Sequence, residues 1–196
     1  MEKILLLSNN DNVKPLYDWL MNRYRVMLSH EPITTETISD LRPDLVISYN
    51  YRHIVKEDVI NLMGDRIINM HTSYLPWNKG ASPNIWSFID NTPKGVTIHR
   101  LEKGIDTGKI IFQKQVMFDE DIETLSTTYS KLNEEIVNLL IDNWDDISTF
   151  NYNLIDQAGL GSYHRTSDLD ALLNGRHIDY SITIKEFKDF ISNSRE

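Results

Sequence analysis

Apolar and polar positions in the first third of the chain recur in units of strand, turn and helix. An apolar run at 3–7 is typical of a buried strand, and the polar turn at 8–12 leads into a helical pattern. Similar units follow at 25–41 and 44–62, and a fourth strand is expected at 66–70. Alternating strands and helices predict an α/β fold with a Rossmann-like, doubly wound, mostly parallel sheet flanked by helices.

After the fourth strand, longer segments replace this alternation. A loop at 71–82 is long for a compact α/β protein, which points to a functional role, and Pro83 is expected in the first turn of the next helix. The pattern then predicts two strands and one long amphipathic helix, at 95–101, 109–116 and 123–147. These elements complete a predicted main domain, residues 1–147.

From residue 148 onward the periodicity weakens, and we expect residues 148–196 to form a short C-terminal appendage. Its expected elements are a helix at 168–173, a strand at 178–182 and a last helix at 184–191. The sequence has no internal repeat and no flexible Gly/Ser linker that would mark a further boundary.

Composition narrows the classes of function. The 196 residues are 40% hydrophobic and 25% charged, as in ordinary folded proteins. No apolar run reaches the roughly 18 residues of a membrane span, and no signal peptide is evident, so a cytoplasmic protein without membrane contact is expected. The absence of cysteine excludes disulfides, thiolate nucleophiles and sulfur-ligated zinc. A formal net charge of −9 argues against nucleic-acid binding.

Three polar residues are the candidates for chemistry. Asn69 and His71, two positions apart at the end of a predicted strand, leave the same face at its carboxyl end, where open α/β sheets bind ligands. Asp106 lies between Gly104 and Gly108 in a tight loop. Acyl transfer to an amine suits these three groups. The Asn69 amide can donate to the developing oxyanion, the His71 imidazole can relay a proton, and the Asp106 carboxylate can set the protonation state of the imidazole. The spacing alone also suits ordinary hydrogen-bonded residues.

The stretches around these residues carry four motifs in one order. They are Asn-x-His at 69–71, Ser-x-Leu-Pro at 73–76, Gly-Val-Thr-x-His at 95–99 and Asp-x-Gly at 106–108. Together they resemble the formyltransferase family that uses 10-formyltetrahydrofolate, most clearly over residues 44–116. The resemblance implies a folate-dependent N-formyltransferase that needs no metal.

The resemblance also implies roles for particular residues. It assigns catalysis to Asn69, His71 and Asp106. It places the pterin of the formyl donor between two segments, mostly through backbone contacts. The candidate residues for this cofactor site are Arg52, His53, Ile54 and Val55 in the first segment and Leu101, Gly104 and Ile105 in the second.

Departures from the subgroups of this family point to the substrate. The turn at 8–12 lacks the glycines of the phosphate loop in glycinamide ribonucleotide enzymes. The chain given stops at Glu196 without the C-terminal barrel of initiator-tRNA enzymes, and it is acidic. What remains resembles the sugar N-formyltransferases of surface-polysaccharide pathways. We therefore expect the acceptor to be an amino-dideoxy sugar on a nucleotide diphosphate, with dTDP as the expected nucleotide.

Six residues are candidates for binding this sugar nucleotide: Trp77, Asn78, Lys79, Asn84, His164 and Arg165. Trp77 would cover a sugar or base, or simply cap the core. Lys79, and the His164–Arg165 pair, would meet the diphosphate, although such side chains are often only solvated. Asn84 would bind the sugar or cap its helix.

Two alternatives remain open. One is a glycinamide ribonucleotide formyltransferase of purine synthesis, and the other is a relative that binds folate without turnover. A complete set of Asn69, His71 and Asp106 weighs against the second. The expected partners are small molecules, namely the reduced folate and the nucleotide sugar. The oligomeric state stays open, with a homodimer among the alternatives.

Overall fold

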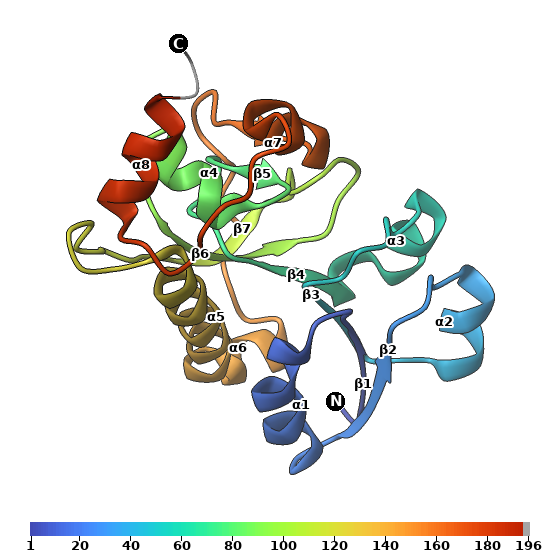
Figure 1. Cartoon of the computed structure of the whole chain (residues 1–196). Coiled ribbons are helices and arrows are strands. Elements are labelled where there is room, and N and C mark those ends of the chain that lie inside the picture. The colour runs from blue at the N-terminus through green and yellow to red at the C-terminus, as the bar shows by residue number, and fades with distance from the viewer. Residues whose placement is uncertain (194–196) are drawn as a thin grey trace.

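The computed structural model describes residues 1–193, and its centre is a six-stranded sheet in the order β2-β1-β3-β4-β6-β7 (Figure 1). Its strands are β1 (Lys3–Leu7), β2 (Arg25–Ser29), β3 (Leu45–Tyr49), β4 (Ile67–His71), β6 (Gly95–Arg100) and β7 (Ile110–Gln115). The first four run parallel, and β6 is antiparallel to both β4 and β7. The predicted mostly parallel α/β sheet is confirmed. Residues 194–196, the end of the predicted appendage, lie outside the described residues.

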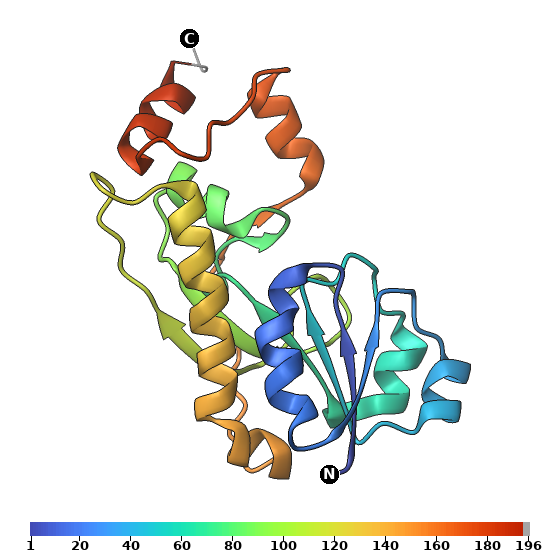
Figure 2. The same cartoon turned by 60° about the horizontal axis from the view of Figure 1, so that its bottom comes forward.

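Helices cover both faces of this sheet (Figure 2). They are α1 (Lys14–Met21), α2 (Thr35–Leu41), α3 (Glu57–Met63), α4 (Pro83–Ile89), α5 (Leu125–Asp142), α6 (Trp144–Thr149), α7 (Thr166–Leu173) and α8 (Ile184–Ser192), with short 3-10 turns η1 (Asp11–Val13) and η2 (Gly64–Arg66). A second sheet consists of β5 (Lys79–Gly80) and β8 (Tyr163–His164). Within the described residues no helix is both long and apolar enough to cross a membrane.

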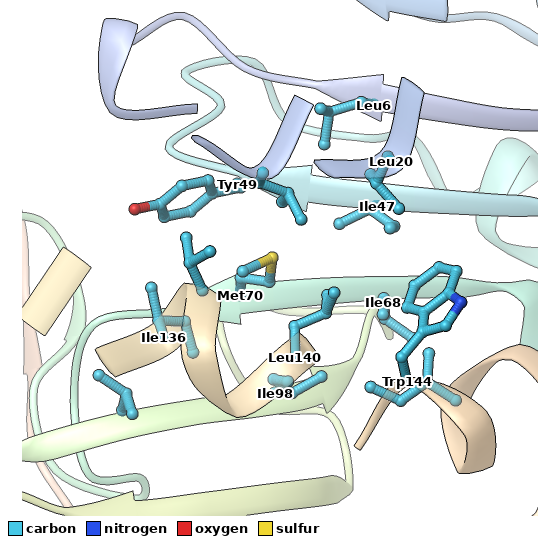
Figure 3. Packing of buried hydrophobic residues seen from close by; sticks show 14 of the residues in the cluster. Leu6, Leu20, Ile47, Tyr49, Ile68, Met70, Ile98, Ile136, Leu140 and Trp144 are labelled. Atoms are coloured by element: carbon cyan, nitrogen blue, oxygen red, sulfur yellow. The ribbon is translucent and has the colours of Figure 1, made fainter. Parts of the chain in front are cut away.

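The central strands β1 and β3 are largely apolar on both faces because both faces are buried. In β1, Leu6 joins the core beneath α1, α5 and α6, whereas its neighbour Leu5 joins the core beneath α2 and α3. This follows from the two-residue repeat of a strand. Figure 3 shows the larger core, where Leu6 and Ile47 of the sheet face Leu140 of α5.

Two predicted elements are wrong in detail. The helix expected at 123–147 is two helices that break at Asn143. The break turns Trp144 onto Trp19 and lets its indole N–H donate to Tyr24 Oη at 2.9 Å, and this tertiary contact overrides helical continuity. The strand expected at 178–182 is a loop, in which the Asp179 carboxylate accepts a hydrogen bond from the backbone N–H of Ser181 at 2.9 Å.

The segment after residue 148 packs on the rest of the chain at several points. Ile184 and Phe187 of α8 are fully buried in a small core with Phe88 of α4 and Leu125 of α5. In both views α6 and α7 lie well apart, so the chain between them crosses much of the molecule (Figures 1 and 2). The division at residue 147 stays a prediction.

Candidate active site

Two catalytic candidates leave the end of β4 on the same face. Asn69 and His71 stand two residues apart in this strand, as its alternation requires. In the antiparallel pairing with β6, Asn69 lies opposite His99. Asp106 belongs to the loop between β6 and β7 and has a left-handed backbone, with φ of 52°. That conformation is uncommon for a residue with a side chain and often accompanies function.

The Asp106 carboxylate is the centre of the cluster and is almost buried, with 11% of its side chain exposed. Its Oδ1 accepts a hydrogen bond from Asn69 Nδ2 at 3.2 Å and lies 3.5 Å from His99 Nε2. Its Oδ2 accepts a hydrogen bond from the backbone N–H of Gly80 at 2.9 Å and lies 3.7 Å from His71 Nε2. The structure therefore brings the three predicted residues together and adds His99.

The surroundings of Asp106 keep it ionised. Burial by itself raises the pKa of this carboxyl, because a buried charge loses its hydration. When the two rings are protonated, the charge of His71 and the hydrogen bond and charge of His99 lower it, and so does the Gly80 N–H. Together they outweigh burial and hold the pKa of Asp106 well below its usual range. Asp106 is therefore a carboxylate at physiological pH.

Nearby carbonyl oxygens indicate which nitrogen of each histidine ring carries the proton when the ring has only one. His71 Nε2 lies 3.0 Å from the Asn78 carbonyl oxygen, so Nε2 donates and Nδ1 keeps its lone pair. His99 Nδ1 donates to the Arg100 carbonyl oxygen at 2.7 Å, and its Nε2 accepts from Asn69 Nδ2 at 3.2 Å. The Asn69 amide thus donates to both Asp106 and His99, and a reacting oxygen would have to replace one of them.

A cleft of about 960 Å³ opens over this cluster and is lined by Asn69, His71, His99 and Asp106. All seven residues predicted to bind the formyl donor also line it: Arg52, His53, Ile54, Val55, Leu101, Gly104 and Ile105. Ile54 is 81% exposed and Ile105 is 43% exposed, although both are apolar. Two exposed isoleucines in one cleft offer an apolar surface for a flat ring.

The predicted substrate residues fall into two groups. His164 and Arg165 line the cleft, together with Tyr163, which the sequence analysis missed. The His164 ring stacks on Trp86 at 3.8 Å, and its Nε2 lies 2.8 Å from Asp90 Oδ2. These contacts already occupy one face and one nitrogen of the ring that was expected to meet a diphosphate.

The other four predicted residues, Trp77, Asn78, Lys79 and Asn84, lie outside the lining of this cleft. Asn78 is fully buried, where its amide donates to Thr92 Oγ1 at 2.8 Å and its carbonyl holds His71. The Asn84 amide donates to the Leu125 carbonyl at 3.1 Å, so it does not cap its helix. Their direct contact with a substrate stays a prediction.

His99 and Gly80 were absent from the predicted site. The Gly-Val-Thr-x-His motif ending at His99 carried a signal, because a histidine beside the Asn69 strand is placed to face it. Gly80 contributes only its backbone N–H, for which a sequence has no marker. Among the described residues no cluster of three or more His, Cys, Asp or Glu side chains is placed to hold a metal ion.

Comparisons with solved structures find the same fold in sugar-modifying enzymes. The formyltransferase PseJ from Anoxybacillus kamchatkensis was solved with UDP-4,6-dideoxy-4-formamido-L-AltNAc and tetrahydrofolate. It is 38% identical to this chain with a TM-score of 0.85, over 94% of this chain and 96% of PseJ. A sugar N-formyltransferase from Shewanella sp FDAARGOS_354 is 25% identical with a TM-score of 0.73, over 97% of this chain and 86% of its own.

A third structure supports the fold alone. The N-formyltransferase from Helicobacter canadensis, solved with folinic acid and dTDP-3-aminofucose, is 23% identical with a TM-score of 0.73, over 99% of this chain and 79% of its own. The family described as formyl transferase matches residues 6–143, which is most of the chain and includes Asn69, His71 and Asp106. The resemblance read from the motifs is confirmed, and this chain belongs to the formyl transferase family.

Proposed function

We propose that this protein transfers a formyl group from 10-formyltetrahydrofolate to the amine of a nucleotide-linked amino-dideoxy sugar. The observation that carries the proposal is the convergence of Asn69, His71 and Asp106 at the base of one cleft. The likeness to PseJ along nearly the whole of both chains supports a sugar as acceptor. We propose that the product is used in surface-polysaccharide synthesis and that the reaction takes place in the cytoplasm, where both charged substrates are expected.

The proton assignments suggest how the residues divide the work. The sugar nitrogen attacks the formyl carbon of the donor, and the bond between that carbon and the folate nitrogen then breaks, so that tetrahydrofolate leaves. His71 Nδ1 carries a lone pair, takes the proton that the attacking amine loses and returns it to the departing folate nitrogen. Asp106, held as a carboxylate, stabilises the resulting imidazolium from 3.7 Å. An amide hydrogen of Asn69 turns from His99 to the formyl oxygen as negative charge develops there.

For the nucleotide part of the acceptor, we propose a pyrimidine nucleoside diphosphate and do not choose between UDP and dTDP. PseJ was solved with a UDP-linked sugar and the Helicobacter enzyme with a dTDP-linked sugar. The wall formed by Tyr163, His164 and Arg165 is our proposed site for this part of the substrate. An exposed aromatic ring beside a guanidinium suits a sugar or base next to a phosphate.

Assays with a panel of acceptors test the proposed function. The protein, given 10-formyltetrahydrofolate, is incubated with UDP- and dTDP-linked amino-dideoxy sugars or with glycinamide ribonucleotide, and kcat/KM values are compared. We expect kcat/KM for at least one amino sugar to exceed that for glycinamide ribonucleotide by about 100-fold or more. A preference for glycinamide ribonucleotide would contradict the proposal and would indicate a role in purine synthesis instead. Folate binding without transfer to any acceptor would support the non-catalytic alternative.

A substitution at Ile54 tests the proposed folate site. Folinic acid should raise the melting temperature of the parent, because a ligand that binds only the folded state stabilises it. The Ile54→Asp variant should bind folinic acid about tenfold more weakly, since a carboxylate would replace apolar surface. Met117→Asp is the control, because Met117 is 78% exposed and lies outside the cleft. Equal affinities of both variants for folinic acid would show that Ile54 is not part of the folate site.

A further inference from the structure

The segment between α6 and α7 passes both loops that hold the catalytic groups. At one end, Ile155 pairs with Ile110 at the start of β7, through two backbone hydrogen bonds of 2.8 and 2.9 Å. At the other end, Tyr163–His164 pairs with Lys79–Gly80, next to the N–H that binds Asp106. Residues 155–165, the crossing segment, are therefore anchored on both sides of the active site.

Within the crossing segment, one side chain reaches the backbone of the Asp106 loop. Gln157 Nε2 donates to the carbonyl oxygen of Asp106 at 2.8 Å and to that of Gly108 at 2.8 Å. An amide nitrogen has two hydrogens, and both are used here. The reverse orientation would direct the amide oxygen at two carbonyl oxygens, so these neighbours select the orientation. Gln157 Oε1 is buried without a hydrogen-bond partner among the described residues.

The loop needs support of this kind at Asp106. Its left-handed φ of 52° costs free energy in a residue with a Cβ, less for Asp than for most others, and contacts with the surroundings offset this cost. The direction of the carboxylate depends on this backbone. The lengths of its bonds to Asn69 and Gly80, 3.2 and 2.9 Å, leave little room for a shift.

We propose that Gln157 is a positioning residue for the formyl transfer: its amide holds the backbone at Asp106 so that the carboxylate stays in contact with Asn69, His71 and Gly80. This inference rests on the proposed function. Gln157 touches no reacting atom and acts only through Asp106. Gln157 lies 51 residues after Asp106 in the sequence, beyond the family match, which ends at residue 143.

The test uses the full chain and the Gln157→Met variant, which keeps the length of the side chain and removes both donors. We expect kcat to fall about tenfold or more, because small misplacements of catalytic groups have effects of this size. KM for both substrates should stay within about threefold, because no binding contact is lost. The control is Leu160→Gln in the same crossing segment, whose fully exposed side chain leaves the loop untouched and kcat unchanged.

A second arm separates positioning from a general loss of structure. In an Asp106→Asn background, where the carboxylate is already gone, Gln157→Met should lower kcat by less than about twofold. An equal loss in both backgrounds would overturn the proposal, as would parent-like kcat in the single variant. Hydrogen exchange of the amides at 102–108 should be faster in Gln157→Met than in the parent, and unchanged exchange would also overturn it. Because this readout needs no turnover, it tests whether Gln157 holds the Asp106 loop even if the parent transfers no formyl group.

Discussion

Replacing His71 with Asn, or Asp106 with Asn, should each lower kcat for formyl transfer by about 100-fold or more. His71→Asn removes the nitrogen that takes the proton of the amine. Asp106→Asn removes the charge that stabilises the protonated ring at 3.7 Å, and it replaces one of the two oxygens that accept hydrogen bonds from Asn69 and Gly80. Steady-state kinetics measure both variants, and circular dichroism checks that the fold is intact. Values of kcat within a few-fold of the parent would exclude the relay.

Two further measurements distinguish a relay from independent contributions. The double variant should be little slower than either single variant, because the two residues act as a unit. The Asp106→Asn defect should also persist across about pH 5 to 9, since the depressed pKa of Asp106 keeps the parent carboxylate ionised over this range. A defect that disappears toward acidic pH would show that Asp106 takes up a proton there.

Gly108→Ala should reduce both stability and activity, with an expected loss of about 2 kcal/mol in the free energy of unfolding and about 100-fold in kcat. A Cβ at this position would lie 1.8 Å from the Arg100 carbonyl oxygen, which belongs to a backbone that cannot rotate away. The loop must then move, and Asp106 lies only two residues away. Urea unfolding and steady-state kinetics test the two effects separately.

Gly64→Ala is the matched control for this variant. Gly64 has a left-handed φ of 57° and no atom within 4 Å of an added Cβ, so the substitution strains the backbone without a collision. It should lower the free energy of unfolding by about 1 kcal/mol and leave kcat unchanged. Parent-like kcat in Gly108→Ala would mean that the loop absorbs the displacement without moving Asp106.

Local periodicity was sufficient to predict the strands of the six-stranded sheet, including the one that carries Asn69 and His71. A strand buried on both faces is apolar throughout, which is why residues 3–7 were recognised and match β1. The two-residue repeat placed Asn69 and His71 on one face without knowledge of the neighbours. The motif order then indicated Asp106 as their partner, and the contacts in the structure agree.

Contacts between residues that are distant in the sequence could not be predicted from local periodicity. Helix α5 ends at Asp142 because Trp144 packs on Trp19, more than a hundred residues earlier in the chain, and helical periodicity continues past that point. The predicted contact of His164 with the diphosphate stays a prediction, and the stacking of its ring on Trp86 and its bond to Asp90 could not be inferred from the sequence.

The contact of Gln157 with the catalytic loop is the clearest example of a feature that only the tertiary structure decided. Nothing in the sequence around Gln157 marks it, since a lone glutamine in an irregular segment carries no periodicity and belongs to no motif. Its partners are backbone carbonyls at Asp106 and Gly108, groups that every residue possesses. Periodicity reports which faces of an element are buried. The residues that meet there are selected by the packing of the whole chain, because the free energy of each contact depends on neighbours that are far away in sequence.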